Sequence, residues 1–176
     1  MVKLAKEKNF CNLSISVQEL DFDIQYEIDN IKRRKKNFGG LASFLGQVRD
    51  SAENDKTLLF LELEHYPDMT EKEITSICND ALGKWELHDL RVIHRVGKLI
   101  PGDNIVLVLA TSSHREEAFK AVEFIMDFLK SRVPIWKKEH YENNSSWVKS
   151  KKSDEELLSR WEYSAFFLDL DKAGYE

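Results

Sequence analysis

The chain has 176 residues, of which 42% are hydrophobic and 32% charged, and a formal net charge of -5. A chain of this length can bury a core without disulfides or metal ions, and the composition is typical of one globular domain. The negative charge argues against binding nucleic acid through overall charge. Its apolar runs are shorter than the roughly 18 residues that span a bilayer, and the N-terminus lacks the apolar core of a signal peptide. We therefore expect a cytoplasmic protein that binds neither membranes nor nucleic acids.

Hydrophobic patterning divides the chain into short segments. Alternation predicts strands at 10–17, 41–48, 57–66, 90–96, 104–111 and 135–141, with 147–148 pairing back after a turn. Helical spacing predicts helices at 21–36, from Pro67 to Trp85, from Ser113 to the residue before Pro134, and at 153–168. Strands and helices follow no strict βαβ rhythm. The pattern favours a single α+β domain with a mixed or antiparallel sheet and packed helices.

The helix that begins at Ser113 has the clearest local signals. Ser113 and Glu116 have the spacing of a capping box. His114 and Arg115 fall in its first turn, where free backbone N–H groups favour an anion. The alternative is that Ser113 caps the helix and Arg115 is solvated or paired with an acid. Arg49, which directly follows a strand, has the same two interpretations.

Basic residues are concentrated between 130 and 152, although the chain as a whole is acidic. Seven basic residues stand there against two acidic ones. Such a zone favours a small anionic ligand such as a phosphate. For Lys130 the ordinary alternative is that a lysine at a helix C-terminus complements the helix dipole. A catalytic lysine must also lose its proton, and neighbouring cations or burial ease that loss. The sequence leaves open whether Lys130 acts as acid, base or nucleophile.

Other candidate residues are better explained by structure. Glu62, Glu64 and His65 suit an amphipathic strand end with solvated carboxylates better than a metal site. The two cysteines, Cys11 and Cys78, belong to no CxxC pair, and we expect buried, reduced thiols. Further expectations are a solvated basic run at 32–36, a structural His94-Arg95 pair on a buried strand, and core positions for Trp136 and Trp147.

Several stretches, in the same order along the chain, resemble the large, catalytic subunit of molybdopterin synthase. They are GLASFLGQVR at 40–49, LEHYPDMTE at 63–71, VIHRVG at 92–97, PGD at 101–103, TSSHR at 111–115 and FIMDFLKSRVPIWKKE at 124–139. The resemblance covers roughly residues 10–160. It implies a domain at 10–160 with a fold like the α/β hammerhead, an N-terminal extension at 1–9 and a C-terminal extension at 161–176.

The resemblance also implies a reaction and its partners. The family inserts two sulfur atoms into cyclic pyranopterin monophosphate to form the dithiolene of molybdopterin. The sulfur arrives as a thiocarboxylate on the C-terminal Gly-Gly tail of a small ubiquitin-like subunit. The family enzyme is a homodimer of large subunits with a small subunit at each end, and the step uses no metal or cofactor.

Residue roles follow from the resemblance by position. Lys130 matches the principal catalytic lysine, and Lys137 the second active-site lysine. Arg49, His114 and Arg115 match residues that hold the anionic pterin. Lys152, flanked by Lys149 and Lys151, stands where the family commonly has an arginine contributed by the other protomer; lysine keeps the charge but loses the bidentate fork.

Two other functions compete with this one. A non-catalytic adaptor that only docks a ubiquitin-like protein would not need Lys130 and would bind no pterin. An RNA-binding module would use the run at 32–36 together with the basic zone, and it would need aromatic side chains interleaved with the cations.

Overall fold

The computed structural model describes residues 11–34, 37–50, 57–148 and 158–161. In chain order the elements are β1 (Asn12–Gln18), α1 (Ile24–Arg34), β2 (Gly40–Gln47), β3 (Phe60–His65), α2 (Met69–Lys84), β4 (Leu87–Arg95), β5 (Gly97–Leu99), β6 (Asn104–Ser112), α3 (Arg115–Ser131), β7 (Ile135–His140) and β8 (Ser145–Trp147). The strands of these residues form two sheets, with orders β1-β4-β6-β2 and β5-β3-β7-β8.

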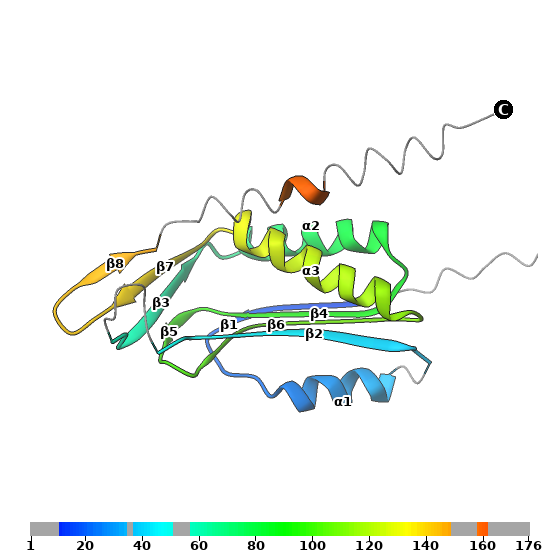
Figure 1. The fold of residues 1–176 in the computed structure, drawn as a ribbon, viewed down its shortest axis with the longest axis horizontal. Helices are drawn as coiled ribbons and strands as arrows, with labels where there is room; N and C mark the ends of the chain where they lie inside the picture. The colour runs from blue at the N-terminus through cyan, green and yellow to red at the C-terminus, as the bar shows by residue number, and fades with distance from the viewer. Residues whose placement is uncertain (1–10, 35–36, 51–56, 149–157, 162–176) are drawn as a thin grey trace, which may run out of the picture.

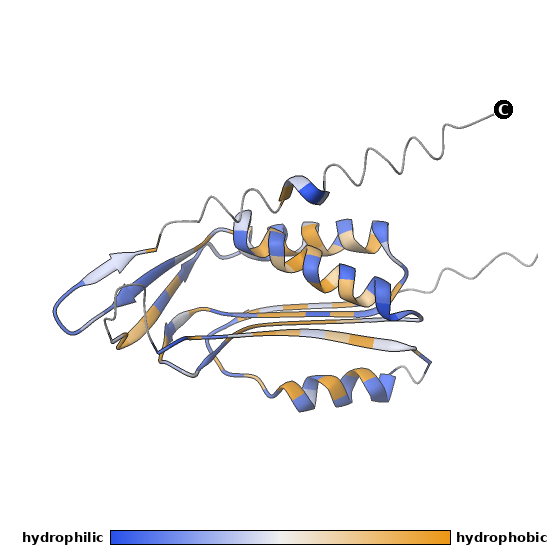
Figure 2. Ribbon diagram, in the orientation of Figure 1, coloured by the Kyte–Doolittle hydropathy of each residue, from blue (hydrophilic) through white to orange (hydrophobic). Residues whose placement is uncertain are grey.

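The first sheet is the centre of the molecule. β1 pairs with β4 in parallel, whereas β4 with β6 and β6 with β2 are antiparallel. Helix α1 covers one face of this sheet, and α2 and α3 cover the other (Figure 1). Because both faces are covered, the two inner strands β4 and β6 are buried over almost their whole length. Figure 2 shows apolar residues along these strands, between the helices.

Side chains of β4 alternate between the two covered faces. Leu90 and Val92 belong to the large core cluster that includes Ile125 of α3, and Ile93 packs in a separate cluster with Ile31 of α1. This alternation assigns every residue of β4 to one face. His94 therefore points to the face that α2 and α3 cover, and Arg95 points to the face of α1.

The second sheet continues from one end of the first sheet (Figure 1). Strand β3 is antiparallel to both β5 and β7, and β7 and β8 form a hairpin. A smaller core cluster lies here, with Leu61, Leu63, Leu99 and Val48, and Ile135 packs against both this cluster and the large one. The start of β7 is therefore the place where the two sheets meet.

The α+β class and most of the predicted segments are confirmed. The 147–148 segment pairs back on β7 as predicted, through the antiparallel register of Lys138 with Trp147. Strand β5 was not predicted from the sequence. It is only three residues long, and the turn-forming residues at 101–103 follow it closely, so it shows no strand pattern of its own. Most of the predicted helix at 153–168 lies outside the described residues; positions 158–161 are helical.

Two local predictions are wrong. Ser113 does not cap α3: the N-cap is His114, in an extended conformation and without a side-chain cap bond, and the Ser113 hydroxyl instead lies 3.0 Å from His88 Nε2. Trp136 and Trp147 are not core residues, because 47% and 51% of their surfaces are exposed. Trp136 alternates with the inward-facing Ile135, so it must stand on the outer face of the second sheet.

Candidate active site

Lys130 is exposed in the last turn of α3, close to where the two sheets meet. The helix ends at Ser131, and the Arg132 backbone N–H donates to the Phe128 carbonyl as its C-cap. Arg132 Nη2 lies 2.7 Å from Glu73 Oε1 of α2. This ion pair compensates the charge of Arg132, whereas the neighbouring Lys130 is exposed to solvent.

Lys137 and Lys138 are adjacent on β7 and point in opposite directions. Lys138 lies opposite Glu62, and its Nζ stands 5.3 Å from the ring centre of Trp147. Lys137 lies opposite Leu63, on the face that Ile135 shares with the two core clusters. Lys137 is therefore the lysine of this strand that faces the junction of the sheets.

Arg49 reaches the same end of the molecule from β2. The Val48 N–H donates to the Asp103 carbonyl at 2.9 Å, and the Gly102 N–H donates to the Val48 carbonyl at 2.8 Å. These bonds hold the chain beside the turn between β5 and β6, and Val48 is part of the same small core cluster as Leu63. Arg49 follows directly and is exposed. Arg49, Lys130 and Lys137, which we call the lysine cluster, thus gather at one end of the fold.

The His94-Arg95 pair has the structural role that its buried strand predicts. Arg95 donates to the carbonyls of Glu19 and Asn104 at 3.1 Å each. His94 is 8% exposed, and its Nδ1 lies 2.8 Å from the Arg95 carbonyl oxygen. Burial lowers the pKa of His94 to about 4; its hydrogen bond to the Arg95 backbone opposes this shift, and the charges of Lys137 and His65 add to it.

His114 and Arg115 lie at the N-terminus of α3. Both are exposed, and they follow Ser113, whose backbone passes close to Gly39, the residue before β2: a Cβ on Gly39 would lie 2.0 Å from the Ser113 carbonyl oxygen. The Ser112 hydroxyl bonds to the Glu117 carboxylate, and the His114 N–H donates to the same hydroxyl at 3.4 Å. The backbone N–H groups of the first turn and the Arg115 guanidinium can attract an anion, and the His114 ring can donate a hydrogen bond to it.

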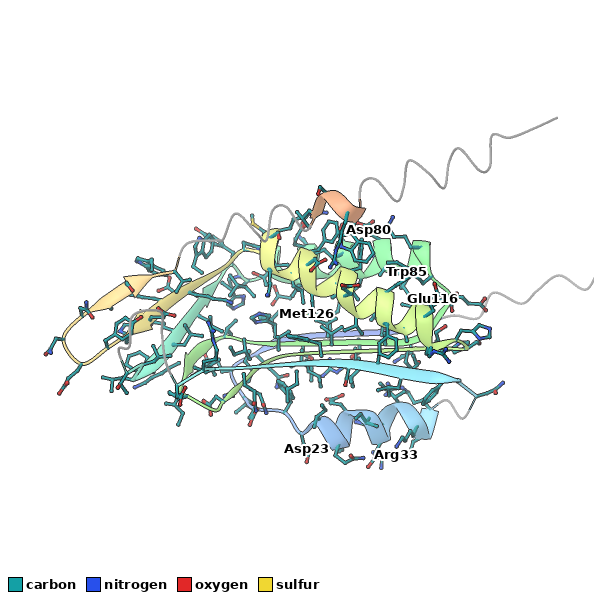
Figure 3. All side chains as sticks on the ribbon, viewed as in Figure 1. Asp23, Arg33, Asp80, Trp85, Glu116 and Met126 are labelled. Atoms are coloured by element: carbon teal, nitrogen blue, oxygen red, sulfur yellow. The ribbon has the colours of Figure 1, made fainter. Side chains whose placement is uncertain are left out.

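The structure separates the predicted site residues into two groups. Arg115 and Lys130 are fifteen residues apart on α3, which at 1.5 Å per residue is about 22 Å along the helix. In Figure 3, Glu116 marks the N-terminal end of α3, and Met126 lies nearer to the second sheet. Lys152 lies outside the described residues. One copy of the chain therefore carries the lysine cluster and the His114-Arg115 pair as separate groups.

An open pocket beside Trp136 is a feature that the sequence did not suggest. Glu64, His65, Tyr66, Trp136 and Trp147 line it, and the rings of Tyr66 and Trp136 meet edge to face at 5.7 Å. The alternation of Trp136 with Ile135 was the signal that could have revealed this pocket.

The structure favours solvated or paired side chains over a metal site at Glu62, Glu64 and His65. Glu62 accepts a hydrogen bond from His140 at 2.8 Å. Among the described residues, no three His, Cys, Asp or Glu side chains are grouped so that they could hold a metal ion.

The fold and these groups define a class of protein: an α+β domain of two sheets with exposed basic residues at both ends of its longest described helix. The family model described as "MoaE protein" matches residues 17–132. The molybdopterin synthase catalytic subunit of Brucella melitensis is 47% identical over 154 residues, which cover 86% of this chain and 93% of that protein. The chain therefore belongs to the MoaE family.

Solved structures agree with this assignment. The molybdopterin biosynthesis MoaE protein of Burkholderia ambifaria superimposes with a TM-score of 0.72 at 41% identity, over 85% of this chain and 97% of that one. A protein–protein complex of subunits 1 and 2 of the molybdopterin-converting factor of Helicobacter pylori shares the fold, with a TM-score of 0.63 at 22% identity over 79% of this chain and 91% of that one. Among the described residues, no helix is both long and apolar enough to cross a membrane.

Proposed function

We propose that this chain is the catalytic subunit of a molybdopterin synthase. It transfers two sulfur atoms from the thiocarboxylated C-terminus of a small ubiquitin-like carrier to cyclic pyranopterin monophosphate, and the product is the dithiolene of molybdopterin. Membership of the MoaE family supports the reaction. The observation that carries the proposal is the convergence of Arg49, Lys130 and Lys137, from three separate elements, at one end of the fold.

The lysine cluster has the chemistry that this reaction needs. The carrier tail and the substrate phosphate are both anions, and they must approach each other in one pocket. Exposed ammonium and guanidinium groups lower the cost of that approach, and arginine can hold a phosphate through two parallel hydrogen bonds. Lys130 is the principal catalytic residue in this proposal and Lys137 the second, because both present an ammonium group to the same junction.

The substrate-binding residues come from two copies of the chain. Arg115 and Lys130 of one copy are about 22 Å apart along α3, which is too far for one small substrate. A homodimer in which the N-terminus of α3 from one copy meets the lysine cluster of the other would bring His114 and Arg115 to the substrate. Two such sites form in a symmetric dimer. Lys152 completes the set of predicted substrate-binding cations.

A small carrier bound at each end of the dimer gives a heterotetramer. The Helicobacter pylori structure, a complex of two subunits of the molybdopterin-converting factor, supports a partner of this kind. We place the assembly in the cytoplasm, where the thiols of Cys11 and Cys78 stay reduced. No cofactor takes part in the proposed step.

Turnover of the purified proteins tests the function. The chain is mixed with thiocarboxylated carrier and cyclic pyranopterin monophosphate, and the dithiolene product is measured. We expect product from the wild type and loss of turnover in Lys130→Ala. Lys120→Ala is the matched control, because Lys120 is an exposed lysine on the same helix whose ammonium is paired with Glu116 at 2.7 Å.

The results of this experiment distinguish a catalytic subunit from a non-catalytic adaptor. Full activity in Lys130→Ala, or equal losses in Lys130→Ala and Lys120→Ala, would contradict the catalytic assignment of Lys130. Stable binding of the carrier without any product from the wild type would favour the adaptor.

A further inference from the structure

A bulge at the start of β4 directs a buried histidine toward the N-terminus of α3. Leu87 pairs with Ser112 of β6 and Asp89 pairs with Thr111, so His88 is the extra residue between the two pairs. The Asp89 N–H donates to the Thr111 hydroxyl at 2.9 Å and holds this register. A bulge changes the direction of the side chain that it inserts, and here it turns the imidazole toward the segment that follows β6.

The His88 ring is 5% exposed and meets a hydroxyl at the surface. Its Nε2 lies 3.0 Å from Ser113 Oγ, and Ser113 itself is exposed. Nδ1 is buried and, among the described residues, has no hydrogen-bond partner. A proton on Nδ1 would be a buried donor without an acceptor, and such donors are rare because they cost free energy. The proton is therefore on Nε2, and His88 donates the bond to Ser113.

This bond leaves the Ser113 proton available for another acceptor, because the hydroxyl oxygen already accepts from His88. Ser113 directly precedes His114 and Arg115, at the end of α3 that Glu116 marks in Figure 3. The N-cap has no side-chain cap bond, so the backbone N–H groups of the first turn are donors as well. A hydroxyl, a guanidinium and several N–H groups at one helix end are the donors that bind a phosphate.

The two carboxylates of the first turn are bound by other donors. Glu117 bonds to the Ser112 hydroxyl, and Glu116 Oε1 lies 2.7 Å from Lys120 Nζ. Among the described residues, the hydrogen-bond partner of the Ser113 side chain is His88. An acceptor for the Ser113 proton must therefore come from solvent or from a bound ligand.

We propose that Ser113 is a further substrate-binding residue and that His88 positions it: the Ser113 hydroxyl donates a hydrogen bond to the anionic group that Arg115 attracts. The proposal rests on the proposed role of His114 and Arg115 in binding the pterin phosphate. A hydroxyl that a buried ring holds in one rotamer loses little conformational entropy when the ligand binds. Ser113 is not a nucleophile in this proposal, because a histidine acting as its base would need a group that orients Nδ1, and the described residues supply none.

Nitrogen-15 NMR of the full chain tests the geometry without any assay of activity. We expect the His88 ring to be protonated on Nε2, and Ser113→Ala to shift the Nε2 signal because the acceptor is lost. Inorganic phosphate is then titrated, and the amide signals of the first turn of α3 are followed. We expect a dissociation constant roughly 10-fold higher in Ser113→Ala than in the wild type. The matched control is Ser76→Ala, an exposed serine on α2, which should bind phosphate like the wild type.

Three results of this titration would overturn the proposal. They are a His88 ring protonated on Nδ1, no phosphate binding at this end of α3 in the wild type, and equal dissociation constants in the wild type and Ser113→Ala.

Steady-state kinetics tests the consequence for the substrate. Ser113→Ala should raise KM for the pterin roughly 10-fold with little change in kcat. Ser113→Thr keeps the hydroxyl and should stay near the wild-type KM. His88→Gln and His88→Met are a matched pair of similar size, of which only glutamine can donate a hydrogen bond to Ser113. We expect a raised KM in His88→Met and a nearly unchanged KM in His88→Gln.

The double variant separates positioning from packing. If His88 acts through Ser113, His88→Met raises KM in the wild-type background and has no further effect in Ser113→Ala. Equal increases in both backgrounds, at equal thermal midpoints, would show that His88 acts by packing alone and would overturn its positioning role.

The two arms distinguish failure of this inference from failure of the proposed function. If the wild type makes no dithiolene product, the function fails, and the phosphate titration still decides whether Ser113 binds an anion. If the wild type is active and Ser113→Ala has the wild-type KM, the inference fails and the function stands.

Discussion

Arg115 and Lys130 are the first and the penultimate residue of one helix, α3, and therefore lie on opposite ends of the same rigid element. Their separation of about 22 Å exceeds the length of a pterin phosphate and is fixed by helix geometry. If both residues serve one substrate, they must come from different copies of the chain. A substrate bound by both residues would therefore link the oligomeric state of the protein to its activity.

Mixing two inactive variants tests this link. Lys130→Ala and Arg115→Ala homodimers should each be inactive, since every site lacks one essential group. After unfolding and refolding together in equal amounts, half of the dimers are mixed on statistical grounds, and each mixed dimer holds one intact site of its two. We expect recovery of about a quarter of the wild-type activity.

The control for this experiment is a mixture of Lys130→Ala with the double variant Lys130→Ala/Arg115→Ala, in which no pairing restores a complete site. If the mixture of single variants stays as inactive as this control, both residues act within one copy or Arg115 does not act at all. Either result would contradict a substrate site that is built from Lys130 of one copy and Arg115 of the other.

Gly39 controls the position of the His114-Arg115 pair. A Cβ at this position would lie 2.0 Å from the Ser113 carbonyl oxygen, so Gly39→Ala must displace the backbone that enters α3. We expect a loss of roughly 1–3 kcal/mol in the free energy of unfolding and a higher KM for the pterin. Gly83→Ala is the matched control, because a Cβ there meets no atom within 4 Å. That variant should be neutral or stabilised by up to about 1 kcal/mol. Urea unfolding of both variants measures the difference, and equal effects would contradict the close approach.

Patterns that depend on one element alone were predictable from the sequence. The apolar face of α3 showed the correct periodicity, because this helix buries one face against a single layer. Trp136 was misjudged for the opposite reason. Its hydrophobicity suggests burial, but its alternation with Ile135 assigns it to the outer face of a sheet that the described residues leave uncovered there. The hydrophobicity of Trp136 predicted a buried side chain and its place in the alternation predicted an exposed one, and the second prediction was correct.

Relationships between elements far apart in the chain were not predictable. The Ser113-Glu116 spacing matches a capping box, yet the Ser113 hydroxyl bonds to His88, which lies 25 residues away. The pairing of Arg132 with Glu73 depends on how α2 packs beside α3. The same limit applies to the candidate site: the order of the motifs predicted Arg49, His114, Arg115, Lys130 and Lys137 as site residues, but it contained no information on which of them share one end of the fold.

His94 should make the protein less stable in acid. Its pKa is about 4 in the folded chain and 6.5 in the reference state. Above pH 6.5 the ring is neutral in both states and its contribution to stability is complete. Between pH 6.5 and 4 the unfolded chain binds a proton that the folded chain does not bind. The free energy of unfolding therefore decreases as the pH is lowered, by on the order of 3 kcal/mol at pH 4.

Urea unfolding at several pH values measures this loss. The difference between the wild type and His94→Gln isolates it, because all other titrating groups are common to both proteins. The wild type should lose more stability than the variant over this range of pH. Parallel curves for the two proteins would contradict the neutral, buried state of His94.

Asp127 anchors the segment at 158–161 to α3, one helical turn before Lys130. The carboxylate is 8% exposed and accepts hydrogen bonds from Arg160 Nε at 3.0 Å and from Trp161 Nε1 at 2.7 Å. The indole of Trp161 meets the rings of Phe124 and Trp85 edge to face. The hydrogen bond to Asp127 also raises the pKa of Arg160, which keeps the guanidinium charged. Together these contacts tie the end of the described chain to α3, the helix that carries the proposed catalytic residue Lys130.

Asp127→Asn should weaken this anchor, because an amide offers one acceptor oxygen without charge and places an N–H₂ group against the other donors. We expect a loss of about 1–3 kcal/mol in the free energy of unfolding. Glu123→Gln is the matched control: Glu123 pairs with the same Arg160 at 2.9 Å, but its side chain is 55% exposed, and exposed pairs contribute about 1 kcal/mol or less. Urea unfolding, with the intrinsic tryptophan fluorescence as a second probe, compares the two. A loss in Glu123→Gln as large as that in Asp127→Asn would show that the surface charge of Arg160, and not the buried carboxylate, holds the segment on α3.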